Sequence, residues 1–273
     1  MPLTAAQREQ VRRQLRRVNR RRGAKWTAFD PRQIERNLAA QLSALIVPPL
    51  FTEYRRALAP MAGDAAAFDA DVSPDKIREI THNFTESHAA RWQEALELWA
   101  SRSNNETKTL FLHNCAKLLG VDVSSVLRDQ RTQALVDRSV SRAGRLIKTI
   151  PAEAQTRVIR AMREVIRGEA PEGFSLREQL STIEGITDRR AQLIARDQTA
   201  KLVTKIDEVR QRDVGVTQYT WRTSHDERVR PSHEDNDGQV FSWDAPPPET
   251  GHPGEDINCR CTAEPDLSGI LGE

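Results

Sequence analysis

The sequence predicts a mainly α protein, with an elongated helical N-terminal region followed by a small α+β module at the C-terminal end. Apolar residues recur at steps of three and four through most of the first 215 residues, which is the spacing of helices that bury one face. The hydrophobic fraction is only 38% and the mean hydropathy is −0.63, which favours long solvated helices over one large core. After Gly215 the pattern changes to short alternating segments bounded by Gly and Pro, as in strands.

Residues 1–25 are interpreted as a basic N-terminal arm. They hold nine basic residues against one acid, Glu9, while the whole chain has a net charge of +2, so the remainder is net acidic. Such an arm can bind nucleic acid or an acidic protein surface, although a solvated helical tail would have the same composition. The candidate contact residues are Arg12, Arg13, Arg16, Arg17, Arg20, Arg21 and Arg22.

A helical domain is expected over residues 26–173. Pro48 and Pro49 are predicted to break or bend its first helix. The next helix is predicted to open at Ser73 and Pro74, because serine caps helices and proline suits their first turn. Its buried face is expected to comprise Ile77, Ile80, Phe84, His88, Trp92, Ala95 and Trp99. The helical pattern continues over 109–119, and further helices are expected at 123–150 and 152–166.

The C-terminal module is expected over residues 174–273. Ser175 and Glu178 form a capping box that predicts the start of one helix. A second, long amphipathic helix is expected after Gly185, and Gly215 is expected to close it. One side of the long helix should be buried through Ala191, Ile194, Ala195, Gln198, Leu202, Ile206 and Val209. Alternating residues then predict strands at 216–223 and 239–243, joined by a polar loop.

The module also concentrates histidine and cysteine. His233, His252, Cys259 and Cys261 are candidate ligands for zinc, because imidazole and thiolate suit this ion and a small module gains stability from it. Two alternatives stay open: the residues form hydrogen bonds and packing contacts, or Cys259 and Cys261 form a disulfide. The total of three cysteines argues against the disulfide framework of a secreted protein.

Calcium binding and catalysis are less well supported. Asp235, Asp237 and Gly238 fit part of an EF-hand loop, but its first and last positions would be His233 and Asp244, and strands flank it. The pairs His225–Asp226 and His233–Asp235 could act in acid–base chemistry, and Cys259 beside His252 as a nucleophile. The sequence contains no complete catalytic motif, so we predict no enzyme; the alternative is a metal-dependent hydrolase or nuclease using the His/Cys cluster.

The order of the C-terminal motifs resembles a known family. Gly215 is followed by Tyr219 and Trp221, then by the stretch DERVRPSH from Asp226, a turn at Gly238, the pair His252-Pro253, and Cys259-Arg260-Cys261. Residues 180–263 thereby resemble the phage Mu F-like head morphogenesis domain. Many members join His-Pro almost directly to Cys-Arg-Cys, whereas residues 254–258 intervene here and can move His252 out of reach of a shared site. The structural motif positions are Tyr219, Trp221, Asp226, Arg228, Gly238 and Arg260.

The resemblance implies a low-copy minor head protein of a phage that acts in head assembly near the portal and in genome packaging or ejection. It implies no catalytic activity and no small-molecule substrate. The implied partners are the portal protein and the capsid or scaffold proteins, with packaged DNA as a candidate partner of the basic arm. The implied location is the host cytoplasm during assembly and then the virion head. No run of 18 apolar residues is present, so no membrane is expected as a partner.

Overall fold

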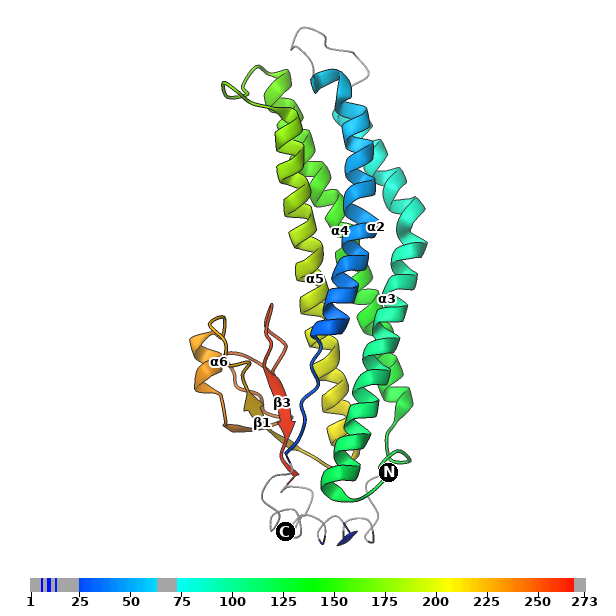
Figure 1. Ribbon diagram of the computed structural model, residues 1–273, viewed down its shortest axis with the longest axis vertical. Helices are drawn as coiled ribbons and strands as arrows, with labels where there is room; N and C mark the ends of the chain where they lie inside the picture. The colour runs from blue at the N-terminus through cyan, green and yellow to red at the C-terminus, as the bar shows by residue number, and fades with distance from the viewer. Residues whose placement is uncertain (1–5, 7–8, 11–12, 14–24, 63–72, 268–273) are drawn as a thin grey trace. The chain divides into compact units, whose positions relative to one another are not determined.

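Helices dominate the computed structural model, which describes residues 6, 9–10, 13, 25–62 and 73–267 (Figure 1). The helices are α2 (Arg32–Leu58), η1 (Ala59–Ala62), α3 (Pro74–Leu119), α4 (Asp129–Ile166), α5 (Leu176–Asp213) and the short α6 (Pro231–Asp235). The strands are β1 (Gln218–Arg222), β2 (Val240–Ser242) and β3 (Thr262–Pro265). The predicted fold class, mainly α with a small α+β module at the end, is confirmed. No helix in the described ranges is long and apolar enough to cross a membrane.

The chain forms two compact units, and each is discontinuous in sequence. The helical unit comprises residues 35–99 and 140–196, and the C-terminal unit comprises residues 1–34, 100–139 and 197–273. Helices α3, α4 and α5 each contribute one part to each unit.

The helical unit buries the apolar faces of α2 and α3. Of the face predicted for α3, Ile77, Phe84, Trp92, Ala95 and Trp99 are buried, while Ile80 and His88 are half-buried. His88 is part of this packing, since its ring stacks on Phe84 with centroids 4.1 Å apart and its Nδ1 lies 2.9 Å from the Phe84 carbonyl oxygen.

The predicted break at Pro48 and Pro49 is wrong, because α2 continues through both residues to Leu58. Proline removes a helical hydrogen bond, but apolar residues on both sides are held in the core: Ile46, Val47, Leu50 and Phe51 are all buried. Burial of the apolar side chains on both sides of the prolines therefore outweighs the loss of the helical hydrogen bonds. Pro151 lies inside α4 in the same way.

The boundaries of α4 and α5 differ in part from the expected ones. The expected start of a separate helix after Gly185 is wrong, because α5 runs without a break from Leu176 to Asp213. A single helix, α4, replaces the two expected over 123–150 and 152–166, and it begins at Asp129. Val123 and Val126 precede it and fill a core instead. The cap predicted for α5 is present, because the Glu178 N–H donates to Ser175 Oγ over 3.3 Å. The predicted face of α5 is buried except for Val209, which is half-buried.

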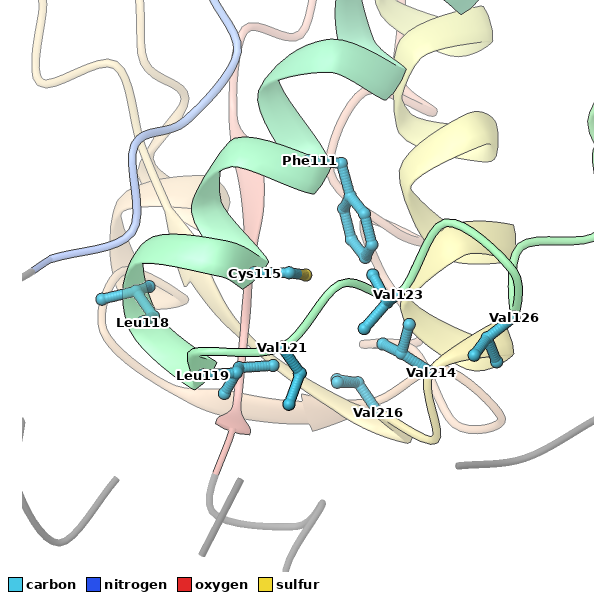
Figure 2. Close-up of a cluster of buried hydrophobic side chains, with 9 residues drawn as sticks. All are labelled: Phe111, Cys115, Leu118, Leu119, Val121, Val123, Val126, Val214 and Val216. Atoms are coloured by element: carbon cyan, nitrogen blue, oxygen red, sulfur yellow. The ribbon is translucent and has the colours of Figure 1, made fainter. Parts of the chain in front are cut away.

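A cluster of buried side chains in the C-terminal unit joins segments that are far apart in the sequence. Figure 2 shows Phe111 and Cys115 of α3, Val123 of the following link and Val214 from the end of α5 pointing toward one another. The remaining members are Leu118, Leu119, Val121, Val126 and Val216. Trp26 closes the cluster through an edge-on contact with Phe111, with centroids 5.5 Å apart. This core holds the end of α5, from which β1 follows.

The described strands form one antiparallel sheet in the order β2-β1-β3. In β1, Thr220 is paired with Val240 of β2 and with Glu264 of β3. Gln211 of α5 ties the sheet to the helix, since it donates to the Ala263 carbonyl over 3.0 Å and accepts the indole N–H of Trp243 over 3.0 Å. Two predicted strands correspond to β1 and β2, while β3 and α6 were not predicted.

Candidate metal centre

Three of the four predicted zinc ligands meet beside the small sheet. His233 lies on α6, a short helix that begins with Pro231 after Arg230 in extended backbone conformation. Cys259 and Cys261 lie in the segment that leads into β3. All three side chains are buried, and their ligand atoms lie within 4.8 Å of one another. Because β1 pairs with β3 and the chain returns from β1 to α6, the sheet brings His233 to cysteines 26 and 28 residues away.

The imidazole of His233 faces both sulfur atoms with the same ring nitrogen. Its Nδ1 lies 3.5 Å from Cys259 Sγ and 3.5 Å from Cys261 Sγ. The other ring nitrogen, Nε2, lies 2.9 Å from Asp256 Oδ2. Trp221 packs edge-on against the ring, with centroids 5.4 Å apart, and keeps this side of the site apolar.

The segment 254–258 builds the surroundings of these ligands. The N–H of Gly254 donates to Cys259 Sγ over 3.3 Å. Asp256 also lies 3.6 Å from the Arg230 guanidinium, whose Nη2 donates to the Ile257 carbonyl over 2.7 Å. Residues that separate His-Pro from Cys-Arg-Cys in the sequence thus hold both His233 and Cys259 in place.

The two cysteines share a proton unequally. The pKa of Cys259 is lowered, chiefly because Cys261 donates a hydrogen bond to its sulfur, with a further contribution from the Gly254 N–H. The pKa of Cys261 is raised, because its proton is held by Cys259 and because the thiol is buried. Cys259 is therefore the first of the two to become a thiolate, which is the form that binds metals.

The fourth predicted ligand, His252, occupies a separate position. Its Nδ1 lies 3.0 Å from the Tyr219 hydroxyl, and its ring packs against Trp243 with centroids 5.0 Å apart. Burial lowers the pKa of His252 and favours the neutral ring. His252 is not in the group of three converging ligand atoms. Its contacts are those of a core histidine.

The residues predicted as structural motif positions surround the centre. Tyr219 and Trp221 are fully buried in a cluster with Trp243 and the two cysteines. Arg260 donates to Asp226 over 2.7 Å, and Asp226 also accepts the backbone N–H of Arg228 over 3.0 Å. That backbone bond is the main reason why the pKa of Asp226 is lowered. Gly238 adopts a φ of 78° and donates to the Trp221 carbonyl over 2.9 Å.

Sequence reasoning missed Asp256, and it considered Asp237 only as part of an EF-hand loop. Asp237 accepts the backbone N–H of Thr223 over 2.8 Å, and this bond lowers its pKa. A carboxylate four residues after His252 carries no motif, so Asp256 could be found only once its contact with His233 was visible. Of the basic arm, Arg13 is described and exposed, and it lies 3.5 Å from Glu9. Arg12, Arg16, Arg17, Arg20, Arg21 and Arg22 lie outside the described residues.

The fold and site define a class: a helical protein that carries a three-stranded module with a buried His/Cys cluster. Residues 153–264 match the family described as Phage Mu protein F like protein. The predicted resemblance to phage Mu F-like proteins is confirmed over this segment.

A protein described as uncharacterized, from Haemophilus influenzae, is 32% identical to the chain over 211 residues. The match covers 75% of this chain and 46% of the relative, so the chain spans about half the length of that protein. No solved structure gives a significant match.

Proposed function

We propose that the protein is a minor head component of a phage, present in low copy and acting in head assembly near the portal. The observation that carries this proposal is the family match over residues 153–264, which includes His233, Cys259 and Cys261. The proposal also includes assembly in the host cytoplasm, later residence in the virion head, and a contribution to genome packaging or ejection.

The long helices support a docking role with the portal and with capsid or scaffold proteins. A helix of 46 residues, such as α3, spans roughly 70 Å. Its outward side is not entirely polar, because Leu98 is 59% exposed. An extended helix face with apolar positions among charges fits recognition of another protein. The basic arm fits a second contact, with packaged DNA or with an acidic protein surface, because clustered arginines bind phosphates and carboxylates.

The proposal is tested by co-expression with the portal protein expected from the same gene neighbourhood, followed by size exclusion with light scattering. We expect co-elution at a defined ratio. A variant with all seven arm arginines changed to Gln separates the two contacts. Retained co-elution with weaker DNA binding assigns the portal contact to the helices, and loss of co-elution assigns it to the arm.

The matched control changes the same seven arginines to Lys, which keeps the charge. If both contacts are electrostatic, the Lys variant should bind DNA and co-elute with the portal protein as the wild type does. Wild-type protein that elutes alone beside the expressed portal, at every protein ratio, would contradict the proposed function.

A further inference from the structure

His233 has a carboxylate neighbour. Asp256 Oδ2 lies 2.9 Å from Nε2, and because a carboxylate only accepts, the N–H at Nε2 donates a hydrogen bond to it. The lone pair of Nδ1 then points at the two cysteine sulfurs. A carboxylate that orients a histidine in this way is a common feature around zinc in proteins, where it fixes the tautomer and makes the ligating nitrogen more basic.

The distances among the three residues match one tetrahedral ion. Zinc binds imidazole nitrogen at about 2.0–2.1 Å and thiolate sulfur at about 2.3 Å, so a tetrahedral angle places the two atoms about 3.5 Å apart. His233 Nδ1 lies 3.5 Å from each sulfur. A hydrogen bond from a thiol gives a similar distance, but one lone pair has a good direction for one donor only. Two sulfurs at the same distance from one ring nitrogen match the arrangement around a shared ion.

The burial of the cluster also favours a cation. The three side chains are 2%, 3% and 6% exposed, and they lie in a module whose core is small. Thiolates are strongly disfavoured in such surroundings unless a positive charge compensates them. A dication satisfies both sulfurs and joins α6 to the segment before β3.

We propose that His233, Cys259 and Cys261 bind one zinc ion, and that Asp256 is a positioning residue that orients His233. The role of the ion is structural: it cross-links two segments that the described hydrogen bonds connect mainly through Asp256 and Arg230.

The first experiment measures metal in the purified full-length protein. We expect one zinc per chain by mass spectrometry of the elements, and a lower melting temperature after removal of zinc with a strong chelator. Replacement of zinc by cobalt should give the thiolate-to-cobalt absorption of a tetrahedral site with two sulfur ligands. Protein that holds no zinc, takes up no cobalt and melts at the same temperature with and without chelator would overturn the proposal.

Variants then assign the ligands. Cys259→Ser, Cys261→Ser and His233→Ala should each lose zinc. The matched controls are Cys115→Ala and His252→Asn, which change a buried cysteine and a buried histidine outside the cluster and should keep one zinc per chain. Because a ligand variant can fail to fold, the chelator titration of the wild type stands as an independent measurement. Zinc retained in all three ligand variants would also overturn the assignment.

Asp256→Asn tests the positioning role. The neutral amide accepts the imidazole N–H less strongly than the charged carboxylate does. We therefore expect zinc affinity to fall about 10–100-fold, while the zinc content at saturation stays at one ion per chain. Competition with a coloured chelator measures this affinity. A thiol titration of the wild type separates zinc from a disulfide: three thiols after zinc removal agree with the proposal, and one thiol, from Cys115, contradicts it.

Discussion

At the scale of single residues, Asp207 and Arg210 on α5 form a charge pair in the C-terminal unit whose carboxylate is poorly compensated. Burial raises the pKa of Asp207 to about 7, and the nearby positive charge of Arg210 only partly offsets this. Arg210 is itself 2% exposed and donates to Thr107 Oγ1 over 2.5 Å and to the Asn104 carbonyl over 2.7 Å. The Arg210 guanidinium thus forms its hydrogen bonds with α3, so it compensates the negative charge of the Asp207 carboxylate only in part.

The sign of the pH dependence follows from the raised pKa. The folded state holds the Asp207 proton more tightly than the unfolded chain, whose carboxyl has an ordinary pKa of 3.8. The stability that this group contributes is therefore present below pH 3.8 and is lost as the pH rises to about 7. We expect Asp207→Asn, which stays uncharged, to be more stable than the wild type at pH 8 by about 1–3 kcal/mol and similar to it near pH 4.

Urea unfolding of both proteins across this pH range measures the difference. An NMR titration of the Asp207 carboxyl carbon provides the direct control, with an expected midpoint near 7. A midpoint near 4, or a stability difference that does not change with pH, would contradict the prediction.

At the scale of elements, the segment between His252 and Cys259 depends on close contact with α5. The backbone at Gly254 has a φ of 81°, and a Cβ there would lie 2.5 Å from Thr204 Oγ1 and 3.1 Å from the Ala200 carbonyl oxygen. Lys205 of α5 reinforces the contact through a 2.7 Å ion pair with Glu255. The segment that carries Asp256 is therefore held by the helix as well as by the cluster.

We expect Gly254→Ala to destabilise the C-terminal unit by about 2–4 kcal/mol, because it adds a steric clash to the left-handed backbone. Gly215→Ala is the matched control: its φ is 89°, but a Cβ there meets nothing within 4 Å. The control should cost about 1 kcal/mol, which is the backbone contribution alone. Chemical unfolding of both variants measures the difference, and equal losses would show that α5 does not approach Gly254 so closely.

At the scale of the whole molecule, α3, α4 and α5 contribute to two compact units, each with its own core. In the C-terminal unit, Leu119 is fully buried, and Asp213 at the end of α5 accepts the Arg128 N–H over 2.7 Å just before α4 begins. The end of α3, the start of α4 and the end of α5 therefore form one packing unit although 80 or more residues separate the first and last.

We expect Leu119→Ala to destabilise this unit by about 2–4 kcal/mol, because a large buried side chain leaves a cavity. Hydrogen exchange should then rise in residues 100–139 and 197–267 more than in residues 35–62, 73–99 and 140–196. Leu98→Ala, at a position 59% exposed, is the control and should change the stability by less than about 0.5 kcal/mol. A uniform rise in exchange across both units would show that they open together.

Much of the fold could be predicted because helical periodicity is local. The buried faces of α3 and α5 follow from residues three and four apart, and the Ser175 cap follows from one short pattern. Helix ends were predicted less well, since Pro48, Pro49 and Pro151 are tolerated where neighbouring residues are buried. Short elements such as α6 and β3 have too few residues for a periodic signal.

The sequence by itself determined the helical fold class and the resemblance of the C-terminal segment to phage Mu F-like proteins, because amphipathic spacing and motif order lie along the chain. Residue type also marked the candidate ligands. Only the tertiary structure decided which ligands meet. It places His233 beside both cysteines, His252 beside Tyr219, and Asp256 beside His233. The physical reason is that strand pairing and the contact of Gly254 with α5 set these distances, and both depend on residues far apart in the chain.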